Sequence, residues 1–277
     1  MPADPVERHR CHAVNPDQGT YLSPATPRIL AHRGLALDAP ENTLLAFLAA
    51  LSAGATHLET DVHASSDGVA VLSHDPTLPG NGAALNQLTM AQLARIDLGH
   101  GQTYCSLAQA LDAFPTALFN VDVKSADAVL PAAQAIVTAR AGHRVLLTSF
   151  SEARRRRVLR ATPGAVSSAS AAGVAMLLVA VALGQRWALP WICRGVSAIQ
   201  VPEHAGLVRI VTPRVLNHMH ALGIEVHVWT VNDPAQMRRL LALGVDGLVT
   251  DRCDVAVRLA KSLGPHASGD SDGESPL

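Results

Sequence analysis

The feature that most constrains the fold is an alternation of short β-branched runs with longer runs rich in alanine and leucine, repeated from residue 28 to residue 263. Each pair is typical of a βα unit, and a series of such units predicts a parallel sheet with helices packed against it. The predicted strands cover residues 28–32, 55–62, 117–123, 144–149, 164–169, 198–201, 225–230 and 247–250, and a short run at 69–73 is expected to pair with the second strand or to extend it. The predicted helices cover residues 42–53, 106–113, 126–141, 151–160, 171–183, 213–222, 234–243 and 254–263.

Eight strands that alternate with helices predict an α/β fold of the TIM-barrel type, a (β/α)8 barrel. The 277 residues of the chain suit one such domain, since these barrels commonly have about 250 residues. An open doubly wound sheet is the structural alternative, and it would want a glycine-rich phosphate loop after its first strand. The sequence there is His32-Arg33-Gly34, with no further glycine at dinucleotide-binding spacing. We therefore expect a barrel over residues 27–264.

The barrel is expected to carry a short insertion between its second and third strands, at about residues 76–104. Proline and glycine recur there, and residues 89–96 have a helical pattern. Because loops at the carboxyl ends of barrel strands build the substrate pocket, we expect this insertion to lie over the barrel mouth. Residues 1–26 and residues 265–277, the latter rich in Ser, Gly, Asp and Glu, are predicted to be disordered tails.

The charge balance excludes a general binder of nucleic acids or other polyanions. Charged residues make up 16% of the chain and the formal net charge is -1, whereas such domains carry a basic excess. The four cysteines are scattered without a C-x-x-C pair, which argues against a disulfide framework or a zinc knuckle. The first twenty residues lack the apolar core of a signal peptide. We therefore expect a cytoplasmic protein with free thiols.

An uncharged and strongly apolar stretch at residues 171–183 raises the question of a membrane segment. Its continuous apolar part has about 14 residues, fewer than the roughly 20 that a spanning helix needs. A buried barrel strand followed by a barrel helix gives the same pattern. Peripheral contact of an exposed face with a membrane surface is the alternative that stays open.

Acidic side chains gather on two of the predicted strands. Glu59, Asp61 and His63 occupy alternate positions of the second strand, so their side chains share one face. The third strand ends in Asp122-Val123-Lys124, which again puts two charges on one face. Burying unpaired carboxylates is costly, and a divalent cation removes that cost. The three carboxylates predict a site for one divalent cation, and hard oxygen ligands suit Mg²⁺ or Ca²⁺ better than zinc.

Two histidines follow predicted strands beside other charged residues. His32 comes before Arg33 at the end of the first strand, and His74 stands beside Asp75 after the run at 69–73. Because a barrel places its chemistry at the carboxyl ends of its strands, both histidines are candidates for acid–base catalysis. Arg33 and Lys124 are the residue types that hold phosphate oxygens. Two histidines, one cation and two fixed positive groups are typical of phosphoryl transfer.

Seven segments, in this order, resemble the signatures of the glycerophosphodiester phosphodiesterase family, and they cover nearly the whole predicted barrel. They are His32-Arg33-Gly34, Pro40-Glu41-Asn42-Thr43, Glu59-Thr60-Asp61-Val62, His74-Asp75, Asp122-Val123-Lys124, Trp229-Thr230-Val231-Asn232 and the run from Gly244 to Asp251.

The resemblance implies a metal-dependent hydrolase of glycerol and lipid metabolism with the TIM-barrel fold. Its reaction would cleave a glycerophosphodiester to sn-glycerol 3-phosphate and an alcohol, by way of a cyclic phosphate formed by the neighbouring glycerol hydroxyl. It implies that His32 and His74 are the acid–base pair, that Glu59, Asp61 and Asp122 bind the metal with Glu41 beside it, and that Arg33, Lys124 and Trp229 contact the phosphate or the substrate.

Two departures from the family pattern leave the substrate open. Asp122 stands where the family usually has glutamate, and the insertion lacks the Arg-Thr-Thr run of many relatives. A more open mouth, together with the apolar run at 171–183, favours a lysolipid, as in lysophospholipase-D-like or sphingomyelinase-D-like barrels. A barrel that binds a phosphodiester without turnover is the non-enzymatic alternative. The sequence does not determine the oligomeric state.

Other polar residues have simpler interpretations. His57, His143, His218, His220 and His266 are expected at the surface, and the run from Arg154 to Arg157 on a solvated helix face. His63 is either a support for the site or polar filler, and His227 is expected to be a satisfied barrel histidine. Asn42 is a candidate helix cap, and Asp246 and Asp251 are expected to fix the last strand and its turn.

Overall fold

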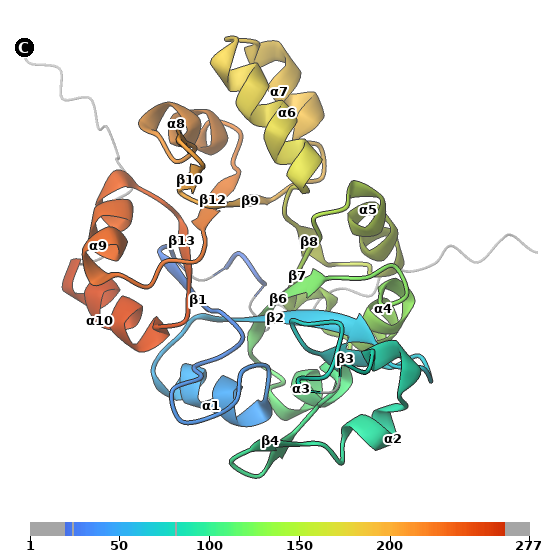
Figure 1. Cartoon of the computed structure of the whole chain (residues 1–277). Helices are drawn as coiled ribbons and strands as arrows, with labels where there is room; N and C mark the ends of the chain where they lie inside the picture. Colours follow the sequence, from blue (N-terminus) through green and yellow to red (C-terminus); the bar gives the residue numbers. More distant parts are fainter. Residues whose placement is uncertain (1–19, 24, 81, 264–277) are drawn as a thin grey trace, which may run out of the picture.

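The computed structural model describes residues 20–23, 25–80 and 82–263, and its centre is a ring of parallel strands surrounded by helices (Figure 1). The ring runs in the order β8-β7-β6-β2-β1-β13-β12-β9, and a parallel bridge between Ser168 and Ala198 joins β8 to β9. The predicted TIM barrel is confirmed. The barrel strands are β1 Arg28–Ala31, β2 His57–Ala64, β6 Leu118–Val123, β7 Val145–Thr148, β8 Val166–Ser167, β9 Ala198–Val201, β12 Glu225–Val228 and β13 Gly247–Thr250.

One outer helix follows each barrel strand. Several begin with a side-chain cap, for example Thr43, Ser170 and Asp233, whose oxygens accept a hydrogen bond from a backbone N–H of the first turn. Asn42, the predicted cap, instead accepts a hydrogen bond from Thr60. The outer helices are α1 Leu44–Ser52, α3 Leu107–Ala113, α4 Val129–Thr138, α5 Glu152–Ala161, α6 Ala171–Ala182, α8 Pro213–His220, α9 Pro234–Leu243 and α10 Cys253–Leu263.

Several short strands and helices lie outside the eight βα units of the barrel. The run at 69–73 forms β3 (Ala70–Leu72), which pairs antiparallel with β2, and η2 (Gly142–Arg144) precedes β7. The predicted insertion has a small core of its own, in which Leu85 and Leu93 pack with Val71 of β3. The sequence did not predict η3 (Arg186–Ala188), α7 (Leu189–Ile192) or the hairpin of β10 (His204–Ala205) and β11 (Val208–Arg209). The insertion consists of η1 Leu85–Gln87, α2 Met90–Leu93, β4 Asp97–Gly99 and β5 Gln102–Thr103.

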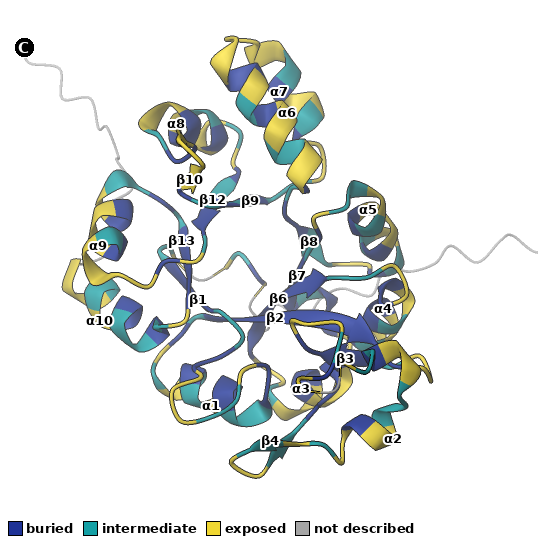
Figure 2. Cartoon of the chain, in the orientation of Figure 1, coloured by how far each residue is buried: buried dark blue, intermediate teal, exposed yellow. Residues whose placement is uncertain are grey.

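The main core lies between the barrel and its helices. β2 and β6 are buried along their whole length, and the inner faces of the helices are buried against the strands (Figure 2). In the part of the chain that the structure describes, no helix is both long and apolar enough to cross a membrane.

The amino ends of the strands are closed by residues that the sequence assigned to a tail. Tyr21 is fully buried and packs edge-on against His57, with ring centroids 4.5 Å apart. His57 is itself fully buried and donates a hydrogen bond to the Tyr21 carbonyl oxygen at 2.9 Å, so its predicted surface position is wrong. Burial lowers the pKa of His57 to about 3 and keeps it neutral. The other predicted tail residues, 1–19 and 265–277, lie outside the described residues.

A charged network fills the barrel near the same end. The Arg28 guanidinium donates to both carboxylate oxygens of Glu225 at 2.6 Å, and His227 donates to Glu225 Oε2 at 2.9 Å. Gly247 leaves room for this network, because a Cβ there would lie 2.7 Å from the His227 ring. Of the predicted solvated arginines, Arg155 is instead buried and paired with Glu152 at 2.7 Å.

Candidate functional site

The carboxyl ends of the strands surround a cavity of about 550 Å³ at the barrel mouth. It brings together eight of the nine site residues predicted from the sequence, and Glu41 is not among its lining residues. The polar residues that line it are His32, Arg33, Glu59, Asp61, His74, Asn120, Asp122, Lys124, Thr148, Ser149, Gln200 and Thr230.

His32 follows β1 directly and is held by a carboxylate from the far end of the chain. Its Nδ1 lies 2.7 Å from Asp251 Oδ1. Asn232 donates to the other Asp251 oxygen at 2.6 Å and accepts from the Asp251 backbone N–H at 2.9 Å. An ionised carboxylate only accepts hydrogen bonds, so we assign the ring proton to Nδ1, which leaves His32 Nε2 free to accept a proton.

The turn after His32 aims the next side chain at the carboxylates. Arg33 has a φ of +57°, a left-handed conformation that is uncommon for a residue with a side chain. Gly34 follows with φ +89°, and a Cβ there would lie 2.7 Å from the backbone of Ala46. The tight approach to α1 therefore requires glycine in the third position of the His32-Arg33-Gly34 segment.

Three buried carboxylates and two cations form the floor of the cavity. Glu59 Oε2 accepts a hydrogen bond from the Arg33 backbone N–H at 3.0 Å. Lys124 Nζ lies 2.8 Å from Asp61 Oδ1 and 2.7 Å from Asp122 Oδ2. The register explains this closeness, because Asp61 and Asp122 are direct neighbours on β2 and β6. The sequence predicted that Glu59 and Asp61 share one face of β2 and that Asp122 and Lys124 share one face of β6, and all four line this cavity.

The floor contains more acid than its cations neutralise. Burial, together with the charges of Asp61 and Asp122, raises the pKa of Glu59 well above its usual value. Burial also raises the pKa of Asp122, and the nearby Lys124 does not offset it. Burial alone would lower the pKa of Lys124, but its contacts with Asp122 and Asp61 outweigh burial and raise it. Glu59 and Asp122 therefore lie in an environment that disfavours their charged forms.

The donor set has the chemistry of a cation site. Asp61 Oδ2 and Asp122 Oδ1 are buried and accept no hydrogen bond, and the 3.1 Å contact of Asp61 Oδ2 with Arg33 Nε lacks hydrogen-bond geometry. Buried oxygens without partners are what a hard divalent cation would bind. As the side chains stand, no three His, Cys, Asp or Glu groups within the described ranges are placed to hold a metal ion, and Lys124 Nζ lies between the two aspartates. The cation site stays a prediction.

His74 lies in the loop after β3 and is more exposed than His32. Its Nδ1 lies 2.8 Å from Asp75 Oδ1, the same arrangement as His32 with Asp251. His63 Nε2 donates to the His74 backbone carbonyl at 3.1 Å. His63 therefore supports the loop that carries His74, which is the supporting role that the sequence left open.

Two further predicted residues occupy the rim. Glu41 accepts two hydrogen bonds from Arg33 Nη1, at 3.0 and 3.1 Å, so it holds the guanidinium from the solvent side. Trp229 lines the cavity and packs edge-on against Phe150, with ring centroids 6.3 Å apart. Trp229 is therefore part of the cavity wall.

The wall opposite the carboxylates is apolar. It is formed by α6 and the β10–β11 region, and not by the described part of the insertion that was predicted to lie there. Ala171, Val174, Ala175 and Leu178 of α6 line the cavity, with Ala205 and Ile210 from the β10–β11 region. None of the described residues of the insertion at 76–104 does so, and the insertion lies at the outer edge of the barrel beside α3 (Figure 1). The prediction that the insertion covers the mouth was wrong. The apolar face of α6 takes that place.

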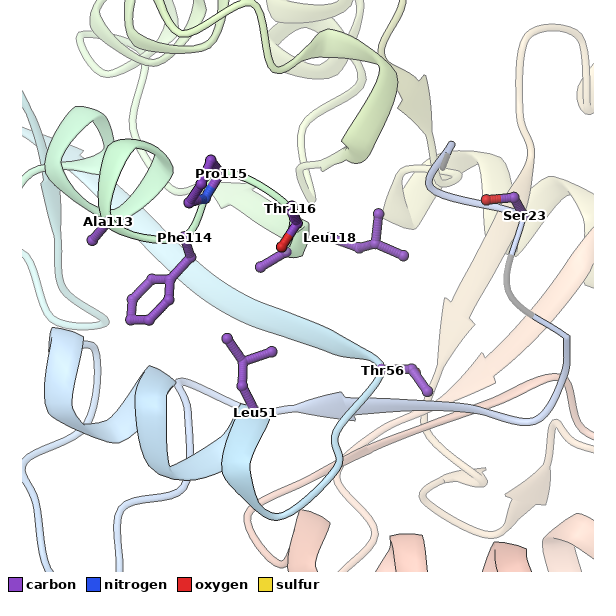
Figure 3. Close-up of a pocket in the computed structure, with 9 residues that line it drawn as sticks. Ser23, Leu51, Thr56, Ala113, Phe114, Pro115, Thr116 and Leu118 are labelled. Carbon is purple, nitrogen blue, oxygen red and sulfur yellow. The ribbon is translucent and has the colours of Figure 1, made fainter. Parts of the chain in front are cut away.

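A second cavity, of about 440 Å³, lies at the opposite end of the barrel, between the ends of α1 and α3 and the start of β6 (Figure 3). No titratable side chain lines it among the described residues. Its walls include Leu51, Phe114, Pro115 and Leu118, with the small polar residues Ser23, Thr56 and Thr116. It has no groups for acid–base or phosphate chemistry, so the mouth is the candidate active site.

The sequence missed two groups of residues at the mouth. Asp251 was expected only to fix a turn, but it holds His32 across 219 positions of sequence. Its place beside Thr250, at the end of the last strand, was the available signal, because that strand adjoins the first in a closed barrel. Phe150 gave no such signal. The apolar run at 171–183 indicated membrane contact or a lysolipid substrate, but not that this helix walls the cavity, since apolar residues in a helix usually mark the core.

Known proteins with similar sequences belong to the family whose signatures this sequence resembles. The model of the glycerophosphoryl diester phosphodiesterase family matches residues 32–255. The Mycobacterium tuberculosis protein named "Probable glycerophosphodiester phosphodiesterase 2" is 40% identical over 232 residues, which cover 82% of this chain and 88% of that protein.

Solved structures show the same architecture. A glycerophosphodiester phosphodiesterase from Agrobacterium tumefaciens superimposes with a TM-score of 0.69 at 24% identity, covering 84% of this chain and 99% of that one. An Oleispira antarctica phosphodiesterase, solved with the product sn-glycerol 3-phosphate, gives a TM-score of 0.68 at 20% identity, covering 84% and 96%. These likenesses establish the fold.

Proposed function

The chain belongs to the glycerophosphoryl diester phosphodiesterase family, and from this membership we propose that it hydrolyses a glycerophosphodiester to sn-glycerol 3-phosphate and an alcohol at its barrel mouth. One observation carries the proposal. His32 and His74 line the same cavity, each with Nδ1 beside a carboxylate, and Arg33 and Lys124 line it with them. This gives two proton-transfer groups and two cations around the space for one phosphate.

The histidines would divide the proton transfers between them. One imidazole Nε2 takes the proton of the glycerol hydroxyl next to the phosphate as that oxygen bonds to phosphorus. The other histidine, protonated, gives a proton to the alcohol oxygen as its bond to phosphorus breaks. Water then opens the cyclic phosphate with the roles exchanged. Asp251 and Asp75 would stabilise the imidazolium forms of their partners.

A divalent cation is part of the proposal. Glu59, Asp61 and Asp122 would hold Mg²⁺ or Ca²⁺, which when bound polarises a phosphate oxygen. The balance of charge supports this. Three carboxylates face two cations, Arg33 and Lys124, so the ionised floor would repel an anionic phosphodiester. With the aspartates engaged elsewhere, Lys124 and Arg33 are free to bind phosphate oxygens.

The proposal is tested by the product. Purified protein is incubated with glycerophosphocholine, with Mg²⁺ or Ca²⁺ and separately with EDTA, and sn-glycerol 3-phosphate is measured. We expect product only with the divalent cation. His74→Ala should lower kcat by about 10²- to 10⁴-fold, the range for loss of a general acid or base.

His100→Asn is the matched control. His100 is exposed in the β4–β5 turn with a φ of +54°, which asparagine tolerates, and it does not line the cavity. We expect this variant to retain wild-type activity. Equal rates in wild type and His74→Ala would contradict the role of His74, and equal rates with and without EDTA would contradict the cation.

A second candidate function concerns the substrate alcohol. The α6 side of the cavity is apolar and contains Val174 and Leu178, which suits the hydrocarbon chain of a lysolipid better than choline. In this alternative the same groups cleave a lysophospholipid phosphodiester. The measurement is kcat/KM for lysophosphatidylcholine against glycerophosphocholine, in wild type and Leu178→Asn. A loss in the variant confined to the lysolipid would favour it, and no turnover of any lysophospholipid would rule it out.

A further inference from the structure

Helix α6 is apolar on every side and yet lies on the surface. All twelve residues from Ala171 to Ala182 are alanine, glycine, valine, leucine or methionine. A helix on the surface of a globular protein normally carries polar residues on its outer face, and a helix that is apolar all round is normally buried. Here one side faces the barrel through Leu177 and Val181, and the outer side remains exposed. Within the described residues, the barrel therefore leaves the outer face of α6 uncovered.

The exposed apolar side chains continue from α6 into η3 and α7. We define the apolar ridge as Met176, Val179, Leu183, Trp187 and Trp191, whose exposed fractions lie between 55% and 75%. Helices α6 and α7 project beyond the ring of the other helices, and their outer sides are exposed (Figure 2). Scattered exposed apolar residues are ordinary, but five of them on segments that pack together, two of them tryptophans, are typical of an interaction surface.

The charges along the segment that carries the ridge have one sign. The chain has no acidic residue between Glu152 and Glu203, a stretch that contains α6, η3 and α7. Arg186 and Arg194 lie at the two ends of the tryptophan-bearing segment and are both exposed. Apolar side chains bounded by tryptophan and arginine are the composition of surfaces that rest in the interface of an anionic bilayer.

We propose that the apolar ridge docks the protein on a lipid bilayer that carries anionic headgroups. The single sign of the charges favours this partner over a second copy of the chain, because a symmetric interface would bring the arginines of two copies together. The docking surface inserts the ridge at the level of the headgroups and does not span the bilayer. Docking by itself does not depend on the proposed function.

The apolar ridge lies close to the cavity at the barrel mouth, so docking would bring the bilayer near the candidate active site. The face of α6 that lines the cavity, with Ala175 and Leu178, adjoins the face that carries Met176 and Val179. Leu207, fully exposed at the tip of the β10–β11 hairpin, follows Ala205, which also lines the cavity. A bilayer on the ridge would therefore lie beside the mouth. If the proposed function holds, an amphiphilic phosphodiester would reach His32 from the bilayer with its apolar part along α6.

The experiment measures binding without turnover. Full-length protein is co-sedimented with vesicles of phosphatidylcholine containing phosphatidylglycerol, and the partition coefficient is compared for wild type and Trp187→Ala/Trp191→Ala. We expect the double variant to lose about tenfold or more in partitioning, because two large side chains no longer enter the interface. Arg186→Gln/Arg194→Gln should lose about fivefold per arginine, and only on vesicles that contain phosphatidylglycerol.

The matched control is Leu130→Ala/Val137→Ala on α4, which removes two exposed apolar side chains away from the ridge. This control should partition like wild type. All variants should keep the thermal unfolding midpoint of wild type, and Trp187→Ala/Trp191→Ala should retain its kcat/KM for water-soluble glycerophosphocholine. Equal partitioning of wild type and the tryptophan variant would overturn the proposal. A wild-type dimer in vesicle-free solution that becomes a monomer in that variant would also overturn it, because the ridge would then be an interface between copies.

Discussion

The two ends of the barrel both bury charged residues, but they satisfy them differently. At the amino ends of the strands, Glu225 accepts hydrogen bonds from Arg28 and His227. Burial would raise the pKa of Glu225, yet these two partners lower it to about 2. At the mouth, Glu59 and Asp122 have raised pKa values, and Asp122 Oδ1 accepts no hydrogen bond.

The difference indicates that the charges at the amino ends stabilise the fold and that those at the mouth are placed for binding or chemistry. A buried charge with all its hydrogen bonds made holds its surroundings in one arrangement, and removing one partner destabilises the fold. A buried charge without partners costs stability, and its position is explained by what it will bind. Closed barrels of this type keep stability at one end and chemistry at the other. That separation implies opposite effects for substitutions at the two ends of this barrel.

The largest effect is expected at the mouth, from a change that leaves the fold intact. Asp251→Asn keeps the shape of the side chain but can offer His32 Nδ1 a donor in place of an acceptor, which favours the wrong tautomer. We expect kcat to fall by about 10³-fold, as a change of the carboxylate behind a catalytic histidine does in other hydrolases, with KM little changed. Steady-state kinetics and a thermal melt check this. A melt that shifts together with kcat would instead indicate a structural role.

The opposite pattern is expected at the amino ends. Glu225→Gln removes the charge between Arg28 and His227, and we expect the free energy of unfolding to fall by about 3 kcal/mol, as for a broken buried ion pair. The turnover number of the folded fraction should not change. Denaturant titration with an activity assay checks both. A variant as stable as wild type but inactive would break the comparison between the two ends.

The same carboxylate sets a pH dependence. The folded pKa of Glu225 is about 2, below its usual value of 4.5, so its contribution to stability is fully present above pH 4.5. It is lost as the pH falls from 4.5 through 2. The stability advantage of wild type over Glu225→Gln should therefore shrink across that window, and should be constant from pH 5 to pH 7. An advantage that does not change between pH 5 and pH 2 would contradict the pairing.

Divalent cations should stabilise the mouth. A cation that binds only the folded protein adds about 2.7 kcal/mol at a concentration one hundred times its Kd. We expect Mg²⁺ or Ca²⁺ to raise the unfolding midpoint of wild type and to raise that of Glu59→Gln less. The measurement is a thermal melt with increasing cation after EDTA treatment. An equal rise in both proteins would place the binding away from Glu59.

The smallest expected effect is a gain in stability when a carboxylate at the mouth is removed, whereas removing Glu225 at the amino ends should cause a loss. In EDTA, Glu59→Gln should increase the free energy of unfolding by about 1 kcal/mol near neutral pH, because it removes the cost of burying an ionisable carboxyl group. The pKa of Glu59 is raised in the folded protein, so its ionisation costs stability as the pH rises above 4.5. The gain in the variant should vanish below that pH. A loss of stability at neutral pH would show that the mouth is satisfied like the amino ends.

The sequence predicted the barrel because its signal is local and repeated. Each strand and helix has its own period of apolar residues, and even the two-residue strand β8 lies inside the predicted run at 164–169. The mouth was predictable for a related reason, since polar residues that end parallel strands must meet at one edge. Glu59, Asp61 and Asp122 therefore came together as expected.

What the sequence could not predict depends on packing between distant segments. Tyr21 has no periodic neighbours, and only the closed barrel shows that it covers the amino ends of the strands. Arg155 looks like its neighbours in a run of arginines, and its burial follows from the rotation of α5 against the barrel. For α6, the apolar sequence predicted a helix correctly and left contact of an exposed face with a membrane open, but it did not show that another side walls the cavity.

The most direct test measures turnover and stability together for one residue from each end. Glycerophosphocholine hydrolysis and denaturant unfolding are compared for wild type, His32→Ala and Glu225→Gln. We predict that His32→Ala loses about 10³-fold in kcat while keeping its unfolding free energy, and that Glu225→Gln does the reverse. A folded His32→Ala protein that hydrolyses the substrate as fast as wild type would contradict the assignment of the mouth as the active site.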